Sequence, residues 1–488
     1  MSRGLTVDTI RGFVYLSLGS GGKAIVQLSV LVVLARLLTP TDFGLIGLAQ
    51  IVISFSRVFM DFGFGSAIIQ KEEVSEIDTR TGFTFSILLG VLIYFVLWLI
   101  SPIISDVFRE ERLVEILKVV SIVIIFNSYS SIAKGLLYRH MQYRTISTIE
   151  FISYTIGYGA LGVILAYSGF GVWSLVFAVL GQGLLSTLLI VFFSKHTKKP
   201  LLNTTSLKVL SNYGAGYSLG IIFTHLGNFS DKIVVGRILG TEILGLYERS
   251  YQLVRFIAST LGEVTDKALF SPIARKQKDR KKIGTAYIEL TSLVSFVFFP
   301  LGTFIYLNAY EIVYIMLGEQ WLDSVEIVRI MALSLFFIIS SRIGSTIAKA
   351  LGDVYNRALR NFIFALLITI GAFIGTNWGI EGVSYAVFIS FNINYIMAFS
   401  QAKRLTGFSF REFAKSHLDG LFLSVLFAAI YFSLNLIVLD YVFLNPFLTI
   451  LINTFVFCLL FFLVIVVNPS PMIRKLRSRI LIALNLKK

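Results

Sequence analysis

Long apolar stretches separated by short polar connections run through the whole chain. Most stretches hold about 20 to 25 residues, which is enough for an α-helix to cross a hydrocarbon core about 30 Å thick. They lack the alternation of apolar and polar residues that an outer-membrane β-barrel requires. The pattern therefore predicts an all-α polytopic membrane protein with about fourteen transmembrane helices.

The predicted spans lie near residues 13–38, 43–69, 82–104, 113–137, 146–167, 172–193, 213–238, 244–270, 283–308, 324–350, 362–377, 382–402, 418–437 and 447–467. Composition agrees with this class, because 56% of the 488 residues are hydrophobic. The mean hydropathy of +0.81 is more than a water-soluble globule can accommodate. The one cysteine, Cys458, lies in an apolar span, where we expect a small buried residue and no intrachain disulfide.

The distribution of charge predicts how the chain is oriented in the membrane. The 43 Lys and Arg residues outnumber the 28 Asp and Glu residues, which gives a formal net charge of +15. Most of these cations lie in alternate connections and in the terminal segments, as expected for the cytoplasmic side. Both termini are therefore predicted to be cytoplasmic. Nucleic-acid binding is not predicted, because no compact basic domain is present to carry it.

Two segments that lie 201 residues apart have similar sequences without a gap. ARLLTPTDFGLI begins at Ala35, and GRILGTEILGLY begins at Gly236. The identical positions are Arg36 and Arg237, Leu38 and Leu239, Gly44 and Gly245, and Leu45 and Leu246. Each copy joins an odd-numbered span to the next one at the outer side, which indicates two parallel halves related by an axis along the membrane normal. Chance recurrence of glycine and leucine in an apolar chain is the alternative.

The repeat divides the chain into three predicted parts. Residues 1–205 form an N-lobe of six spans, residues 206–410 form a C-lobe of six spans, and residues 411–488 hold two further spans and a basic tail. Arg36 and Arg237 lie near the outer ends of the first and seventh spans. We therefore expect these two arginines to have a structural or gating role rather than to bind substrate at mid-depth.

Sequence motifs for catalysis, cofactors and metals are not found. GSGGK from Gly19 lacks the first glycine and the final hydroxyl of a phosphate-binding loop, and it lies inside a span. GAGYSLG from Gly214 has the wrong spacing for a dinucleotide fingerprint and fits a helix contact between small residues. The four histidines do not have the spacing of a metal site. The sequence therefore predicts no catalytic residue, no cofactor and no metal ion.

Ionisable residues deep inside the predicted spans are the candidates for function. A charge at the bilayer centre is disfavoured by roughly 3 kcal/mol, and it usually faces a polar cavity or a partner. The cationic candidates are Lys23, Arg57, His225 and Arg255 in spans one, two, seven and eight, with Arg342 in span ten. They predict a cationic cavity between the two halves. Guanidinium groups hold phosphate with paired hydrogen bonds, so the expected ligand is a phosphate or pyrophosphate.

Other roles are open for these residues. Arg57 and Asp61, four positions apart, can neutralise each other on one helix face. His225 can be a neutral residue that bonds to a helix backbone. The acids inside the predicted spans are Asp61, Asp231, Glu263 and Glu289. One of them can carry a coupling proton or sodium ion, since a buried carboxylate can exchange a proton in each transport cycle. Structural pairing is the alternative for each acid.

Three segments carry a resemblance to a known family, namely ARLLTPTDFGLIGLAQ from Ala35, DFGFGSAIIQK from Asp61 and DKIVVGRILGTEILGLYERSYQL from Asp231. With the spans and the repeat, the chain resembles the Wzx-type oligosaccharide flippases of the MOP superfamily, and in particular the subgroup that exports colanic or teichuronic acid repeat units. The resemblance implies a MATE-like fold in the bacterial cytoplasmic (inner) membrane. It also implies that undecaprenyl-pyrophosphate-linked oligosaccharide crosses that membrane by alternating access, for polysaccharide biosynthesis.

The partners implied by the resemblance are the lipid-linked oligosaccharide, membrane lipids, and the polysaccharide polymerase and glycosyltransferases of the same pathway. Two alternatives belong to the same superfamily. A peptidoglycan lipid-precursor flippase would share the cations, whereas a MATE-type multidrug or cation antiporter is expected to have fewer spans and acidic binding residues. An enzyme is not predicted, because a membrane polymerase or ligase would normally have a large outer loop with catalytic Arg or His.

Overall fold

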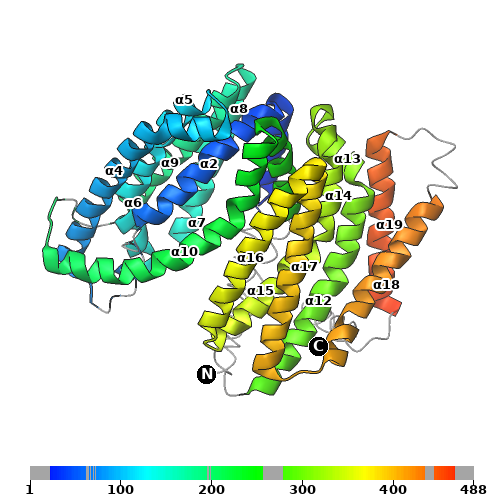
Figure 1. The fold of residues 1–488 in the computed structure, drawn as a ribbon. Helices are drawn as coiled ribbons and strands as arrows, with labels where there is room; N and C mark the ends of the chain where they lie inside the picture. Colours follow the sequence, from blue (N-terminus) through cyan, green and yellow to red (C-terminus); the bar gives the residue numbers. More distant parts are fainter. Residues whose placement is uncertain are drawn as a thin grey trace. The chain divides into compact units, whose positions relative to one another are not determined.

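The computed structural model describes residues 22, 24–61, 65, 68–69, 71, 73–194, 197, 199–256, 279–434 and 445–467, and only the backbone of 58–61, 209–225 and 354. Throughout these residues the regular structure is helical and no strand is present (Figure 1). The prediction of an all-α protein is therefore confirmed. The predicted cation Lys23 and the predicted acid Glu263 lie outside the described residues.

Contacts along the chain form two compact units, Met1–Glu248 (the N-unit) and Arg249–Lys488 (the C-unit). The helices of the N-unit are Ala24–Leu37, α2 (Pro40–Asp61), α4 (Glu76–Phe108), α5 (Leu113–Val120), α6 (Ile122–Arg139), α7 (Tyr143–Ile152), η1 (Ser153–Ala160), α8 (Leu161–Tyr167), α9 (Val172–Phe193) and α10 (Thr204–Ile238). The helices of the C-unit are α12 (Arg280–Leu307), α13 (Ala309–Met316), η2 (Glu319–Ser324), α14 (Val325–Leu333), α15 (Leu335–Ala350), α16 (Val354–Gly375), η3 (Thr376–Trp378), α17 (Gly379–Thr406), α18 (Phe410–Leu434) and α19 (Pro446–Val467). A helix over 241–256 runs from one unit into the other.

Each predicted span overlaps a helix or a run of helices. Among the described residues, eight helical stretches are long and apolar enough to cross a membrane, and the longest, Tyr355–Thr406, contains both α16 and α17. The long helix α10 groups with the N-unit, although the sequence assigned most of it to the C-lobe. The total of fourteen spans and the lobe boundary at 205 remain predictions.

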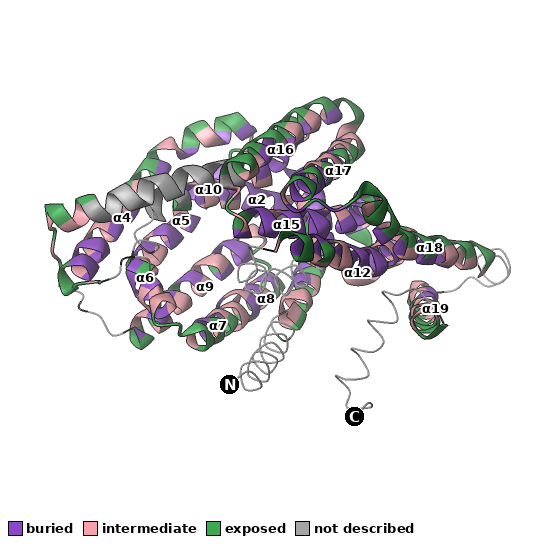
Figure 2. Cartoon of the chain, turned by 90° about the horizontal axis from the view of Figure 1, so that it is seen from below, coloured by how far each residue is buried: buried purple, intermediate pink, exposed green. Residues whose placement is uncertain are grey.

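Large apolar side chains cover the outside of each unit. Leu99 on α4 is 67% exposed and Phe455 on α19 is 66% exposed, whereas the buried residues lie on helix faces that turn toward neighbouring helices (Figure 2). Such faces suit hydrocarbon rather than water. Cys458 is exposed as well, so the expectation that it is buried was wrong. The reason is that α19 buries only Thr449 and Asn453.

In the N-unit, α6 packs against α4 and α9, and α9 packs against η1 and α8. Helix α2 packs against α10 and also contacts α4, α5, α6 and α9. Helix α4 begins in a capping box, in which Asp78 N donates to the Ser75 hydroxyl and the Asp78 carboxylate accepts from Ser75 N at 3.0 Å. It ends at Arg109, which adopts a left-handed conformation with φ of 56°. Local sequence therefore fixes both ends of α4, which packs against α6, a helix of the site described below.

In the C-unit, α12 packs against α18 and α15, and α17 packs against α16 and α15. An aromatic cluster around His417 on α18 joins several of these helices. The hydroxyl of Tyr395 lies 2.7 Å from Nε2 of His417, and the rings of Phe336 and Phe413 lie 5.3 and 4.6 Å from the imidazole. Aromatic pairs at these separations stabilise a core beyond the area that they bury. His417 is therefore part of the packing of the C-unit.

A buried cation, Arg360 on α16, lies where α15, α16 and α17 meet. Arg360 is 5% exposed. Its Nη1 donates a hydrogen bond to Oε1 of Gln401 at 3.0 Å, and its Nη2 donates to Oγ of Ser345. Nε2 of Gln401 donates to Oδ2 of Asp353 at 2.9 Å, and that oxygen also accepts from Arg404 at 2.7 Å. The amide of Gln401 thus connects a buried guanidinium to a carboxylate.

We expect Gln401→Leu to lower the free energy of unfolding by about 2 kcal/mol, because it leaves a buried guanidinium nitrogen and a carboxylate without their shared partner. The measurement is thermal unfolding of the full-length protein in detergent, followed by the fraction that remains monodisperse after heating. Lys403→Ala is the control, since Lys403 is exposed on the same helix. An unfolding temperature equal to that of the control would show that the amide connection does not contribute to stability.

Candidate functional site

A polar cavity of about 370 Å³ lies inside the N-unit. Its walls come from α2, α6, α7, η1 and α9 together with the helix Ala24–Leu37. The lining residues are Gln27, Gln50, Ile53, Ser54, Arg57, Val123, Asn127, Lys134, Glu150, Ser153, Tyr154, Tyr158, Val179, Gln182, Gly183 and Ser186. A polar group within a membrane-crossing helix costs free energy unless it forms hydrogen bonds with another polar group or with a ligand. This cavity is therefore the candidate functional site.

One wall of the cavity depends on an unusual local geometry. The segment η1 is a π-helix, continuous with α7 before it and α8 after it. A Cβ atom on Gly157 of η1 would lie 2.7 Å from the carbonyl oxygen of Gly181 on α9, so these two helices approach each other at the backbone. Tyr154 and Tyr158 of the same π-helix line the cavity. Short π-helical segments occur frequently at functional sites, where the wider turn redirects side chains.

Three charged side chains line the cavity. Nζ of Lys134 on α6 lies 3.3 Å from Oε1 of Glu150 on α7, and these side chains are 40% and 36% exposed. Such a partly exposed pair contributes little to stability, but it neutralises both groups inside the cavity. Arg57 on α2 adds a second cation to the lining. The lining residues therefore carry one formal positive charge in excess, and many uncharged hydrogen-bonding groups surround it.

The predicted cations lie at different places in the two units. Among those whose side chains are described, Arg57 lines the cavity. Arg255, in the helix over 241–256, belongs to the C-unit, and its guanidinium lies 5.5 Å from the ring centroid of Tyr251. Arg342 is half-buried on α15, and the structure describes only the backbone of His225 in α10. A cationic cavity shared between the two halves stays a prediction.

The predicted acids have structural partners where their contacts are described. Asp231 on α10 is 2% exposed, and its Oδ2 accepts a hydrogen bond of 2.7 Å from the hydroxyl of Tyr247. Glu289 is half-buried on α12. Only the backbone of Asp61 is described, at the end of α2. The hydrogen bond from Tyr247 favours a structural role for Asp231. Ion coupling by any of these acids stays a prediction.

Four carboxamide side chains of the cavity were missed by reasoning from the sequence. They are Gln27, Gln50, Asn127 and Gln182. Each lies well inside a predicted span, where a neutral amide hardly changes the average hydropathy. The available signal was the presence of one amide in each of four different spans, since an amide in hydrocarbon needs a hydrogen-bonding partner just as a charge does.

The two repeated segments pack against each other within the N-unit. A Cβ atom on Gly44 would lie 1.8 Å from the carbonyl oxygen of Thr241, and a Cβ atom on Gly245 would lie 1.8 Å from the carbonyl oxygen of Pro40. Pro40 and Thr241 are themselves aligned by the repeat. The contact is therefore reciprocal, and each copy of the segment uses its glycine to accept the backbone of the other.

Polar groups surround this reciprocal contact. Thr241 donates a hydrogen bond of 3.0 Å to Glu110, and Lys232 lies 2.6 Å from Glu248 in a largely buried ion pair. Burial raises the pKa of Glu110, but hydrogen bonds from Arg112 and Thr241 lower it by more, so its pKa lies below the ordinary value. At neutral pH the ionised carboxylate of Glu110 therefore accepts the hydrogen bond from Thr241 in the second repeated segment. The repeat arginines, Arg36 and Arg237, are exposed, and their structural or gating role stays a prediction.

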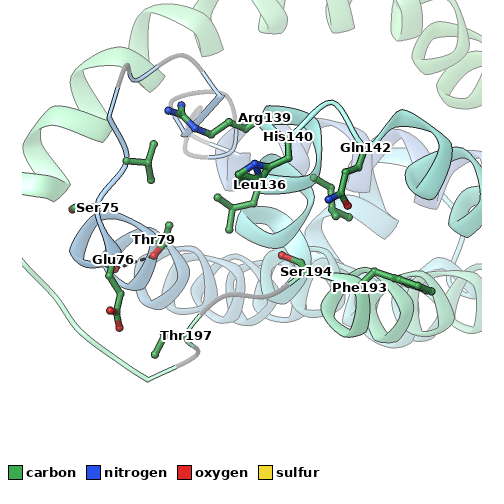
Figure 3. Close-up of a pocket in the computed structure, with 12 residues that line it drawn as sticks. Ser75, Glu76, Thr79, Leu136, Arg139, His140, Gln142, Phe193, Ser194 and Thr197 are labelled. Carbon is green, nitrogen blue, oxygen red and sulfur yellow. Dashed lines mark hydrogen bonds between the residues drawn. The ribbon is translucent and has the colours of Figure 1, made fainter.

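A second cavity of the N-unit, of about 690 Å³, lies where α4 begins and α6 and α9 end (Figure 3). Its described lining includes none of the site residues predicted from the sequence. Arg139 lines it, and Nη1 of Arg139 donates to the carbonyl oxygens of Ile68 (2.9 Å) and Lys71. The guanidinium of Arg139 therefore stabilises the segment that follows α2 through hydrogen bonds to its backbone. We assign no ligand to this second cavity.

A chain whose described residues form helices with apolar outer faces around a polar cavity is a polytopic membrane protein. Residues 33–326, more than half of the chain, match the family described as "Polysaccharide biosynthesis protein". The chain belongs to this family. It is 26% identical over 408 residues to the lipopolysaccharide biosynthesis protein WzxC of Escherichia coli (strain K12), covering 81% of this chain and 80% of that protein. It is 24% identical over 334 residues to the teichuronic acid biosynthesis protein TuaB of Bacillus subtilis (strain 168), covering 67% and 68%.

Solved structures give the fold. The inward closed conformation of the lipid II flippase MurJ superposes with a TM-score of 0.76 at 16% identity, covering 96% of this chain and 100% of that one. An inward-facing multidrug resistance MATE family transporter of the MOP superfamily superposes with a TM-score of 0.63 at 16% identity, covering 79% and 95%. At these identities the likeness concerns the fold alone. The predicted MOP-like polytopic fold is thereby confirmed.

Proposed function

We propose that this protein is a flippase that moves undecaprenyl-pyrophosphate-linked oligosaccharide repeat units across the bacterial cytoplasmic membrane by alternating access, for polysaccharide biosynthesis. The observation that carries the proposal is a polar cavity enclosed by apolar-faced helices in a member of the polysaccharide biosynthesis family. The relatives named for lipopolysaccharide and teichuronic acid biosynthesis support the same substrate class. A transport protein for succinoglycan biosynthesis is a further relative. The protein acts as a transporter and not as an enzyme.

The physical need for such a protein is the cost of carrying a hydrated glycan and a charged pyrophosphate through hydrocarbon. Amide, hydroxyl and guanidinium groups in the cavity replace the water that the head group loses. The polyprenyl tail stays in the bilayer beside the exposed apolar faces of the helices. Both termini lie in the cytoplasm, and the enzymes that assemble and polymerise the repeat unit act on the two sides of the membrane.

Deletion of the gene is the experiment that tests this function. We expect one defined lipid-linked glycan to accumulate on the cytoplasmic face and surface polysaccharide to disappear, with recovery when the full-length chain is supplied from a plasmid. The levels of the peptidoglycan lipid precursor are measured in the same extracts. Accumulation of that precursor instead would support the peptidoglycan alternative, and accumulation of neither would contradict the flippase proposal. Altered tolerance to drug cations alone would support the antiporter alternative.

A further inference from the structure

Two buried polar groups in the cavity wall have no hydrogen-bond partner among the residues that the structure describes. They are Nδ2 of Asn127 on α6 and Oγ of Ser153 on η1. Both residues line the cavity, and Ser153 is 1% exposed. A buried donor that stays without a partner costs free energy. Together these groups offer a hydrogen-bond donor and a hydroxyl, which serves as donor and acceptor, to something that enters the cavity.

An aromatic surface lies in the same wall. The rings of Tyr154 and Tyr158 are stacked, with centroids 5.2 Å apart and an interplanar angle of 15°. Both side chains are half-buried and line the cavity. A phenol ring combines an apolar face with a hydroxyl at its edge. A sugar ring has the complementary character, because its C–H groups form apolar faces and its hydroxyls point outward.

Charge argues against a phosphate at this wall. Glu150 belongs to α7, which leads directly into η1, and its carboxylate is held by Lys134 at 3.3 Å. A phosphate at this wall would compete with Glu150 for Lys134 and would lie close to the Glu150 carboxylate, and both effects are unfavourable. The amides and hydroxyls nearby are neutral. This wall is therefore suited to an uncharged polar ligand.

We infer that the wall formed by Asn127, Ser153, Tyr154 and Tyr158 is a saccharide subsite, which binds a neutral sugar of the substrate rather than its pyrophosphate. The inference rests on the proposed flippase function and assigns one part of the substrate to one wall of the cavity. The sugar hydroxyls satisfy Asn127 and Ser153, and a face of the sugar ring packs against the tyrosines. Selection among glycans then depends on this wall, whereas the charged head group is recognised at another part of the cavity lining, which contains Arg57.

Cysteine labelling of the full-length protein tests this assignment. The chain has one cysteine, so Cys458→Ala gives a background in which Ser186→Cys, on α9 in the cavity lining, is the reporter. Maleimide labelling is followed in proteoliposomes with two probes, the lipid-linked glycan extracted from the deletion strain and undecaprenyl pyrophosphate without sugar. We expect the glycan-bearing lipid to slow labelling at least about threefold more than the sugar-free lipid, which reaches the cavity only with its pyrophosphate. Equal protection by both lipids, or protection by neither, would overturn the inference.

Substitutions in the wall test the same assignment in cells. Tyr158→Ala should reduce export by about tenfold, and Tyr158→Phe, which keeps the ring, should retain most of it. Tyr167→Ala is the matched control, since Tyr167 is 83% exposed at the end of the following helix. Protein abundance in the membrane is measured for every variant. If the wild type clears the lipid-linked glycan and Tyr158→Ala clears it equally well, the subsite is wrong while the proposed function stands. If the wild type clears no lipid-linked glycan, the proposed function itself fails.

Discussion

Gly44→Ala and Gly245→Ala should each reduce surface polysaccharide by about 10- to 100-fold. A single added carbon at either position would lie 1.8 Å from a backbone carbonyl oxygen of the opposite turn, and a backbone cannot retreat as a flexible side chain can. Overpacking of this kind costs about 1 to 3 kcal/mol, which is enough to depopulate the arrangement in which the two turns are joined. If the proposed alternating-access cycle passes through that arrangement, turnover falls with its population. The measurement is surface polysaccharide per cell at matched protein abundance.

The reciprocity of the contact supplies a sharper test of this prediction. Both substitutions disturb the same interface, so the double variant Gly44→Ala with Gly245→Ala should lose less activity than the product of the two single effects. Gly22→Ala is the control, because no atom of the described residues lies within 4 Å of a Cβ added at that helical glycine. Normal export by both single variants would show that the joined turns are dispensable for transport.

The helices of this protein could be predicted because membrane solvation imposes one rule on every span. A backbone in hydrocarbon must satisfy its own hydrogen bonds, so an apolar stretch of about 20 residues becomes a helix whatever its neighbours do. The two repeated turns could also be recognised from their sequences. Their mutual contact could not, because glycine at Gly44 and Gly245 is compatible both with a tight turn and with close packing. Only the three-dimensional structure shows that each glycine makes room for the carbonyl group of the other turn.

Among the residues of the site, a charged side chain within an apolar span could be predicted from the sequence, whereas neutral polar side chains could not. Arg57 stands out because a charge in a span is rare, and the structure places it in the cavity lining. Asn127 and Gln182 escape notice because one amide barely lowers the hydropathy of a whole span. The segment SYTIGYGA gives no sign of the π-helix η1, since the pitch of a helix depends on the packing of Gly157 against α9. Composition therefore identifies costly charges better than it identifies neutral hydrogen-bonding groups.

Arg57→Ala should reduce surface polysaccharide by about 100-fold while the protein remains inserted in the membrane. Arg57 lies on α2, and with Lys134 it gives the cavity lining two cations beside the single carboxylate of Glu150. An anionic head group in a cavity of low dielectric constant depends on such a charge far more than it would in water. Arg57→Lys should retain an intermediate level, because an ammonium keeps the charge but loses the two parallel hydrogen bonds of a guanidinium. Arg411→Ala, at an exposed position in α18, is the control.

The pairing alternative for Arg57 makes the opposite prediction for a double variant. If Arg57 only neutralises Asp61 four positions further along α2, removing both charges in Arg57→Ala with Asp61→Ala should restore export, because no uncompensated carboxylate is left within the membrane. If Arg57 holds the anionic head group, the double variant should stay as inactive as the single one, since the substrate still lacks its cation. Lipid-linked glycan and surface polysaccharide are measured together for the wild type, both single variants and the double variant. Recovery of export in the double variant would assign Arg57 to helix pairing and would remove it from the substrate site.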